Sequence, residues 1–346
     1  MNPRIIIILI IIFLSQTIEF LAFAQKKESA LKLEDIYRNN LYQDKGYGPI
    51  RWSKDNKGYL TFESNIEIGG MDIIMYDAKS GARSVVCSAG LFVLEGHNKP
   101  LSISDYIWSN DNKKLLIFTN TQRVWRYNTR GDYWILDIQT GILKQLGKSF
   151  EPATMMFAKF SPDGSKVAYV SKQNIYVENI ETGNIIKVTT DGGDNIINGT
   201  FDWVYEEELG CRDGFRWSPD GQKIAYWQSD TKGLGTFYMI NNIDSIYPKI
   251  ISFPYPKVGT TNSAVKVGVV SAEGGKTKWF DIPGDPRNNY LARMDFIPNS
   301  DEVMIQQLNR LQNTNRVWIG NTTTMELNNI LTDEEKTFLD IHDNIK

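Results

Sequence analysis

The sequence predicts an all-β protein, a β-propeller of four-stranded blades in which about five blade repeats are present. Two observations predict this fold. An aromatic residue followed by a turn that resembles Ser-Pro-Asp-Gly recurs five times, and each copy leads into a hydrophobic strand. The composition is that of a globular protein, because 41% hydrophobic and 23% charged residues exclude a disordered or collagen-like chain.

The repeated turn has a physical explanation. Proline presets the backbone for a turn corner, aspartate hydrogen-bonds its own backbone, and glycine adopts a positive φ angle without steric cost. Residues 166–170 and 223–227, which follow two of the turns, are rich in β-branched and aromatic side chains that favour strands. The aromatic residues that precede the five turns are Trp52, Trp108, Phe160, Trp217 and Phe296.

A second hairpin follows the first in several units, with its turn at Gly81, Gly141 or Gly183. Two hairpins in each unit make a four-stranded sheet, and such sheets in series are typical of propeller blades. A β-sandwich would not explain the fivefold turn, and a β-helix has a shorter period. The repeat therefore favours the propeller.

The N-terminus has the pattern of a signal peptide. Arg4 precedes an apolar run at residues 5–14, and Ala22-Phe23-Ala24 stands before Gln25. We expect a signal peptide at 1–24, a lead segment at 25–48 with a short helix over 31–40, and the propeller at 49–346. This predicts a periplasmic or secreted protein. An uncleaved N-terminal membrane anchor is the alternative.

Two insertions interrupt the repeat, at 195–211 and 231–264, and insertions in repeat proteins usually form loops on the binding face. The first contains Trp203 and Tyr205 followed by Glu206, Glu207 and Glu208. Neighbouring carboxylates repel each other and remain ionised together only with a cation between them. A primary ammonium has three donors and fits such a pair. The alternative is a solvated acidic turn.

Other kinds of site are poorly supported. Two cysteines and two histidines are too few and too scattered for structural zinc, and no cofactor is expected. Cys87 and Cys211 fall in different repeats and are expected to be unpaired. We interpret His97 and His342 as structural residues because no serine-peptidase motif accompanies them. A net charge of −3 without basic clusters makes nucleic acid an unexpected partner.

Several segments together resemble dipeptidyl peptidase IV, of the prolyl oligopeptidase group of serine peptidases. The most specific is Asp-Trp-Val-Tyr-Glu-Glu-Glu at 202–208, followed by a Trp-Ser-Pro-Asp-Gly strand. Residues 33–37, 247–249, 253–259 and 339–343 also match segments of that family. The resemblance covers about residues 31–346. It implies a propeller that caps an α/β-hydrolase domain and an enzyme that releases X-Pro or X-Ala dipeptides from peptide N-termini.

The resemblance also implies roles for individual residues. The second and third glutamates of the family motif bind the α-ammonium of the substrate, and they match Glu207 and Glu208. An arginine in a Trp-Arg segment contacts a substrate carbonyl and matches Arg126. Trp203, Tyr205 and Glu206 are expected to support these residues. The expected partner is a peptide with a free N-terminus.

The chain also departs from the family pattern. The family propeller has eight blades followed by the hydrolase domain, whose catalytic triad would lie beyond Lys346. We therefore expect this polypeptide to be inactive alone, with an unclosed sheet edge and with a separate or missing hydrolase domain as partner. Because family members often dimerise, a homodimer is a further expectation.

Two other functions compete with this reading. One is a stand-alone extracytoplasmic propeller that binds peptides or amines without catalysis. The other is a carbohydrate-active propeller, which would need two carboxylates about 5–10 Å apart from different blades. Adjacent glutamates on one segment argue against that second alternative.

Overall fold

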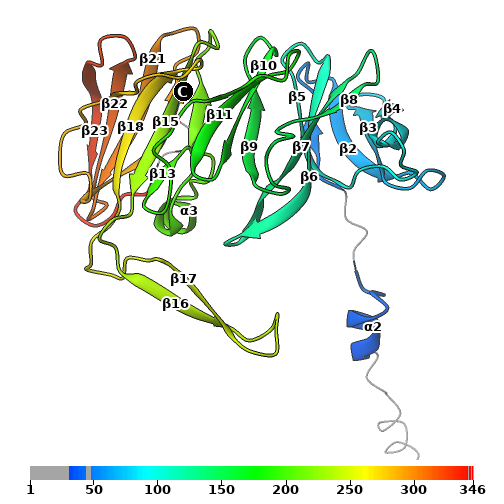
Figure 1. Ribbon diagram of the computed structural model, residues 1–346, viewed down its shortest axis with the longest axis horizontal. Coiled ribbons are helices and arrows are strands. Elements are labelled where there is room, and N and C mark those ends of the chain that lie inside the picture. The colour runs from blue at the N-terminus through cyan, green and yellow to red at the C-terminus, as the bar shows by residue number, and fades with distance from the viewer. Residues whose placement is uncertain (1–30, 44–47, 342, 344, 346) are drawn as a thin grey trace, which may run out of the picture.

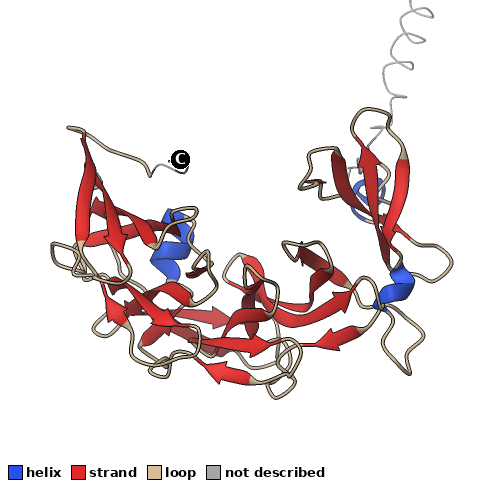
Figure 2. Cartoon of the chain, turned by 90° about the horizontal axis from the view of Figure 1, so that it is seen from above, coloured by secondary structure: helices blue, strands red, loops and turns tan. Residues whose placement is uncertain are grey.

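The computed structural model describes residues 31–43, 48–341, 343 and 345, and it consists mainly of antiparallel strands. Within this part of the chain five blades follow one another along an open arc (Figures 1 and 2). The predicted propeller of five repeats is therefore confirmed. The predicted signal peptide and His342 lie outside the described residues. None of the described helices is long and apolar enough to cross a membrane.

The first three blades are regular. Blade I contains β1 (Arg51–Trp52), β2 (Gly58–Ser64), β3 (Met71–Asp77) and β4 (Arg83–Cys87), followed by a 3-10 turn at Ala89–Phe92. Blade II contains β5 (Ile103–Trp108), β6 (Lys114–Val124), β7 (Tyr127–Asp137) and β8 (Leu143–Gln145). Blade III contains β9 (Met155–Phe160), β10 (Lys166–Ser171), β11 (Asn174–Asn179) and β12 (Ile185–Lys187). Pairing of β7 with β9 joins blades II and III into one eight-stranded sheet.

The last two blades differ because both insertions fall in blade IV. Its strands are β13 (Ile196–Asn198), β14 (Phe215–Trp217), β15 (Lys223–Asp230), β18 (Ala264–Ser271) and β19 (Lys278–Trp279). Blade V is regular, with β20 (Asn289–Phe296), β21 (Glu302–Asn309), β22 (Thr314–Asn321) and β23 (Leu327–Glu334). The five predicted aromatic residues each end the first strand of a blade, or in blade IV the strand β14.

The repeated turn forms as the sequence predicts. In blade II the Ser109 hydroxyl donates to Asp111 at 2.6 Å, and the same carboxylate accepts the Lys113 N–H at 3.1 Å. The residue after the aspartate has a positive φ of 57° at Asn112 and 68° at Gly164. This left-handed conformation explains why the repeat has glycine or asparagine there. Blade V lacks the pairing of serine with aspartate because Ile297 stands at the position of the serine, and its turn instead has a contact from Ser300 to Glu302 at 3.2 Å.

The hydrophobic core lies between the blades, because alternate residues of a strand point to opposite faces of its sheet. On β6, Leu115 and Ile117 pack towards blade I, whereas Leu116 packs towards blade III. The two cysteines lie in different layers of this core, Cys87 between blades I and II and Cys211 between blades IV and V. Both are buried and free, which confirms the prediction that they do not pair.

The insertions have more regular structure than the predicted loops. The first holds β13 and the helix α3 (Trp203–Leu209). The second forms a two-stranded hairpin of β16 (Thr236–Asn241) and β17 (Lys249–Pro254), which we call the arm. The arm projects from the blades on the side where α3 and the tip of the β6–β7 hairpin lie (Figure 1).

The predicted lead helix is also shorter than the sequence indicated. It spans only Leu33–Tyr37, as α2, instead of 31–40. It has no side-chain N-cap and buries none of its residues. A short helix without tertiary packing is marginal in water, which accounts for the difference.

Candidate functional site

The helix α3 carries the three glutamates, and its ends are fixed by local hydrogen bonds. Asp202 is the N-cap, and its carboxylate accepts the Tyr205 N–H at 3.1 Å. Ser263, which directly precedes β18, donates a hydrogen bond to the other oxygen of the same carboxylate. Gly210 ends the helix at a φ of +67°, where a side chain would be strained. Asp202 and Gly210 therefore set the length of α3.

Tyr205 anchors α3 to the core between blades IV and V. Its ring is 3% exposed and stacks on Phe201, with ring centroids 5.5 Å apart. Its hydroxyl accepts the Leu291 N–H at 3.0 Å. Phe201 in turn packs edge-on against Trp227 at 5.1 Å. Tyr205 therefore fixes α3, the helix that carries the three glutamates, to this core.

The three glutamates lie in three different environments, because successive residues point about 100° apart around a helix. Glu206 is buried, at 4% exposure. The Glu207 side chain is 9% exposed, and its Oε2 lies 2.5 Å from Nε of Arg126. Glu208 is exposed and lines a cavity. The structure therefore brings Arg126 and Glu207 together, although the two residues are far apart in the sequence.

Arg126 lies at the tip of the hairpin formed by β6 and β7. Val124 pairs with Tyr127, so Trp125 and Arg126 form a two-residue turn. The Arg126 side chain is 73% exposed, and Glu207 uses its Nε. A guanidinium has five N–H donors, and among the described residues the terminal ones of Arg126 have no ion-pair partner.

Glu206 has its own cationic partner, Arg212, which was not predicted from the sequence. Its Oε1 is 3.6 Å from Nε of Arg212, and among the described residues neither atom has a hydrogen-bond partner. The Arg212 guanidinium also lies 3.7 Å from the ring centre of Tyr127. Burial raises the pKa of the Glu206 carboxyl to about 7, although the charge of Arg212 opposes that rise. Arg212 lies four residues after the motif at 202–208, but no local sequence pattern indicated that it would pair with Glu206.

The raised pKa predicts a pH dependence of stability for Glu206. Between about pH 5 and 7 the folded protein keeps a proton on Glu206 that the unfolded chain releases. The free energy of unfolding therefore falls as the pH rises through this window. Glu206→Gln removes this pH dependence. The free energy of unfolding of the variant, compared with that of the unmodified protein, should therefore rise by about 1–3 kcal/mol from pH 5 to pH 8. Urea unfolding at both pH values measures this difference.

Glu208→Gln is the matched control for this measurement, because the Glu208 side chain is exposed and the substitution is the same. Its pH profile should follow that of the unmodified protein. An equal pH slope in the Glu206→Gln variant and the unmodified protein would mean that Glu206 is ionised throughout the range.

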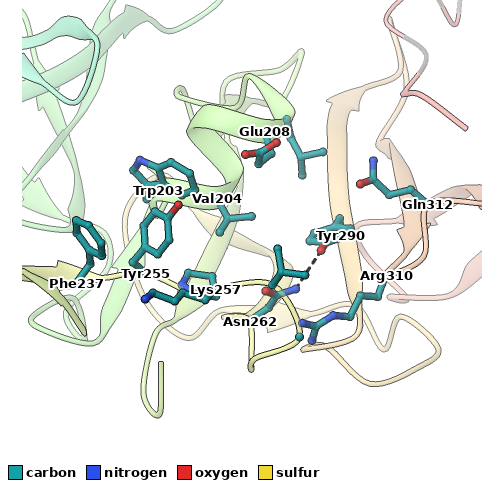
Figure 3. A pocket seen from close by; sticks show the side chains of 14 residues that line it. Trp203, Val204, Glu208, Phe237, Tyr255, Lys257, Asn262, Tyr290, Arg310 and Gln312 are labelled. Atoms are coloured by element: carbon teal, nitrogen blue, oxygen red, sulfur yellow. Dashed lines mark hydrogen bonds between the residues drawn. The ribbon is translucent and has the colours of Figure 1, made fainter. Parts of the chain in front are cut away.

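The cavity beside Glu208 forms where the two insertions meet, and its volume is about 780 Å³. Trp203 of α3 contacts Tyr255 at the base of the arm, with ring centroids 4.3 Å apart. Figure 3 shows Glu208 on one side of the cavity and the cationic side chains of Lys257 and Arg310 on the other. Trp203 thus lines the cavity. Tyr255 lines it as well, and it was not predicted as a site residue from the sequence.

The fold and the site together define a class of protein, a β-propeller in which an insertion helix with three glutamates meets an arginine from a blade hairpin. The sequence matches the family described as Dipeptidyl peptidase IV (DPP IV) N-terminal region over residues 109–346. That match covers more than half of the chain, so this chain belongs to the dipeptidyl peptidase IV N-terminal region family.

Individual proteins that are similar to this chain are named as dipeptidyl peptidases as well. Dipeptidyl aminopeptidase B of Saccharomyces cerevisiae is 32% identical over 74% of this chain and 31% of its own length. Dipeptidyl peptidase 4 of Felis catus is 30% identical over 80% of this chain and 36% of its own. The crystal structure of Porphyromonas gingivalis dipeptidyl peptidase 4 aligns with a TM-score of 0.78 and 29% identity, over 90% of this chain and 43% of that one. The chain spans about a third of the length of these curated relatives.

Proposed function

We propose that this chain is the substrate-gating and N-terminus-recognising part of a serine exopeptidase similar to dipeptidyl peptidase IV. Its role is to hold a peptide by the free α-ammonium, so that an α/β-hydrolase domain releases X-Pro or X-Ala dipeptides. The observation that carries the proposal is the pairing of Glu207 with Arg126 beside the exposed Glu208.

The charge balance of the site supports a cationic ligand. Glu207 is paired with Arg126 and Glu206 with Arg212, whereas Glu208 has no ion-pair partner among the described residues. The glutamates also lie in the second half of a seven-residue helix, towards the negative end of its dipole. A primary ammonium would pair with the carboxylate of Glu208 and offer three donors to the carboxylates of Glu207 and Glu208.

Arg126 has a second role in the proposal. With Nε engaged by Glu207, its exposed terminal N–H groups are available for the first carbonyl of a bound peptide. Two fixed contacts, one at the ammonium and one at the carbonyl, define how far the peptide extends from α3. Such a fixed distance places one peptide bond at a reacting centre and lowers the entropy cost of the reaction.

The proposal predicts discrimination between free and blocked N-termini. Isothermal titration of the folded chain with a short peptide that has proline in second position should show binding. The same peptide with an acetylated N-terminus should bind at least tenfold more weakly, because it loses charge-assisted hydrogen bonds of about 1.5–3 kcal/mol. Equal affinities would exclude recognition of the ammonium.

A second measurement separates the exopeptidase part from a stand-alone binding propeller. The folded chain is mixed with an α/β-hydrolase domain of the same family, and the release of an X-Pro dipeptide is followed. Release that depends on both components supports the exopeptidase. Binding without release in any such mixture favours the stand-alone propeller.

The partners and the location also remain predictions. A homodimer needs a contact surface, and the arm offers one, since Tyr238, Ile240 and Ile250 are each more than 60% exposed. An extracytoplasmic location rests on the N-terminal sequence pattern alone.

A further inference from the structure

The turn that carries Arg126 is strained. Trp125 is the first central residue of the two-residue turn between β6 and β7, and its φ angle is +50°. Hairpin turns with a left-handed first residue normally have glycine, asparagine or aspartate there. A bulky residue in this conformation costs on the order of 1–3 kcal/mol and persists only where its surroundings hold it.

A contact with the arm holds Trp125 in place. The ring centroid of Trp125 is 4.7 Å from that of Phe253 on β17, in an edge-to-face arrangement. Phe253 packs against Phe237 at 5.8 Å and Tyr255 at 6.1 Å. Tyr255 contacts Trp203 of α3. A continuous row of aromatic rings therefore connects the turn that carries Arg126 with the helix that carries Glu207.

The outer part of the β6–β7 hairpin needs such a support. Bulges at Thr119–Gln122 and Gln122–Arg123 interrupt its pairing, and most of residues 121–130 are exposed or half-buried. An isolated two-stranded ribbon is at best marginally stable in water. The Arg126 side chain is mostly exposed and has a large rotamer entropy, so its position depends on how firmly its backbone is held.

We propose that Trp125 and Phe253 form a clamp through which the arm positions Arg126 opposite Glu207. Both are positioning residues, because they act on a ligand only through Arg126. The effect of the clamp on peptide affinity rests on the proposed function, whereas its effect on Arg126 itself does not.

The first test observes Arg126 without a ligand. In protein with ¹⁵N-labelled arginine, the Nε–H signal of Arg126 is assigned by its loss in the Arg126→Ala variant. Phe253→Ala should move this signal towards the position of free arginine, because the contact with Glu207 is loosened. Ile240→Ala, on an exposed part of the same arm, should leave it unchanged. An unmoved signal in the Phe253→Ala variant would overturn the clamp.

The second test uses the peptide with a free N-terminus. Phe253→Ala should weaken binding of this peptide by about tenfold. The separate variant Phe253→Tyr keeps an aromatic ring and should bind the peptide as well as the unmodified protein does. In the Arg126→Ala background, Phe253→Ala should have no further effect, since the two residues act in series. A full additional loss in that background would show that Phe253 acts independently of Arg126 and would contradict the inference.

A third variant separates positioning from folding. Trp125→Gly removes the ring but suits the left-handed turn, so thermal stability should be retained while affinity falls as in Phe253→Ala. Unchanged affinity for this variant would also contradict the clamp. If the unmodified chain does not distinguish free from acetylated peptides, the proposed function fails, and the Nε–H signal still decides whether the clamp exists.

Discussion

Replacing Glu207 and Glu208 together by glutamine is expected to abolish binding of a peptide with a free N-terminus. Each carboxylate would lose a charge-assisted hydrogen bond worth about 1.5–3 kcal/mol, so the dissociation constant should rise by at least about 100-fold. The melting temperature should change little, because Arg126 is 73% exposed and remains solvated without its partner, while Glu208 is exposed. Isothermal titration and a thermal unfolding scan measure both quantities on the same samples.

The chain offers a matched control for this double variant. Glu334 and Glu335 are also adjacent and exposed, and they lie at the outer edge of blade V. Glutamine at both positions changes the net charge by the same amount and should leave peptide affinity unaltered. Survival of peptide binding in the Glu207→Gln, Glu208→Gln variant would show that the ammonium assignment is wrong.

Trp227→Ala is expected to have the largest effect on stability. Trp227 is 2% exposed in the core between blades IV and V, and its indole N–H donates to the Leu291 carbonyl at 2.8 Å. Removal of a buried tryptophan side chain costs about 3–5 kcal/mol, and the Leu291 carbonyl would lose its partner as well. The urea midpoint should therefore fall strongly while the m-value stays constant.

This substitution should also weaken peptide binding, because Trp227 supports Phe201, on which Tyr205 of α3 is stacked. Trp52→Ala is the matched control. It removes the same side chain from β1 in blade I, where Trp52 is 64% exposed. We expect a loss of stability below about 1 kcal/mol and unchanged affinity. Similar losses in the two variants would mean that blades IV and V do not share a packed core at Trp227.

The turns and strands could be predicted from the sequence because their causes are local. A serine, an aspartate and a glycine or asparagine within four residues determine four of the five repeated turns, as at Ser161–Gly164. The alternation along β6 and β10 then determines which side chains enter the core between blades. The helix α3 also has a local signature, with Asp202 as N-cap and Gly210 after its last residue, although a loop was expected for this insertion.

The sequence by itself determined the blade repeat, the separation of the two cysteines and the residues to examine at the site. The contacts between those residues were decided only by the tertiary structure. Arg126 meets Glu207 because the β6–β7 hairpin and α3 project on the same side of the blades, and Trp125 meets Phe253 because the arm projects on that side as well. Such contacts depend on how distant insertions pack against one another, and no short-range pattern in the chain encodes that packing.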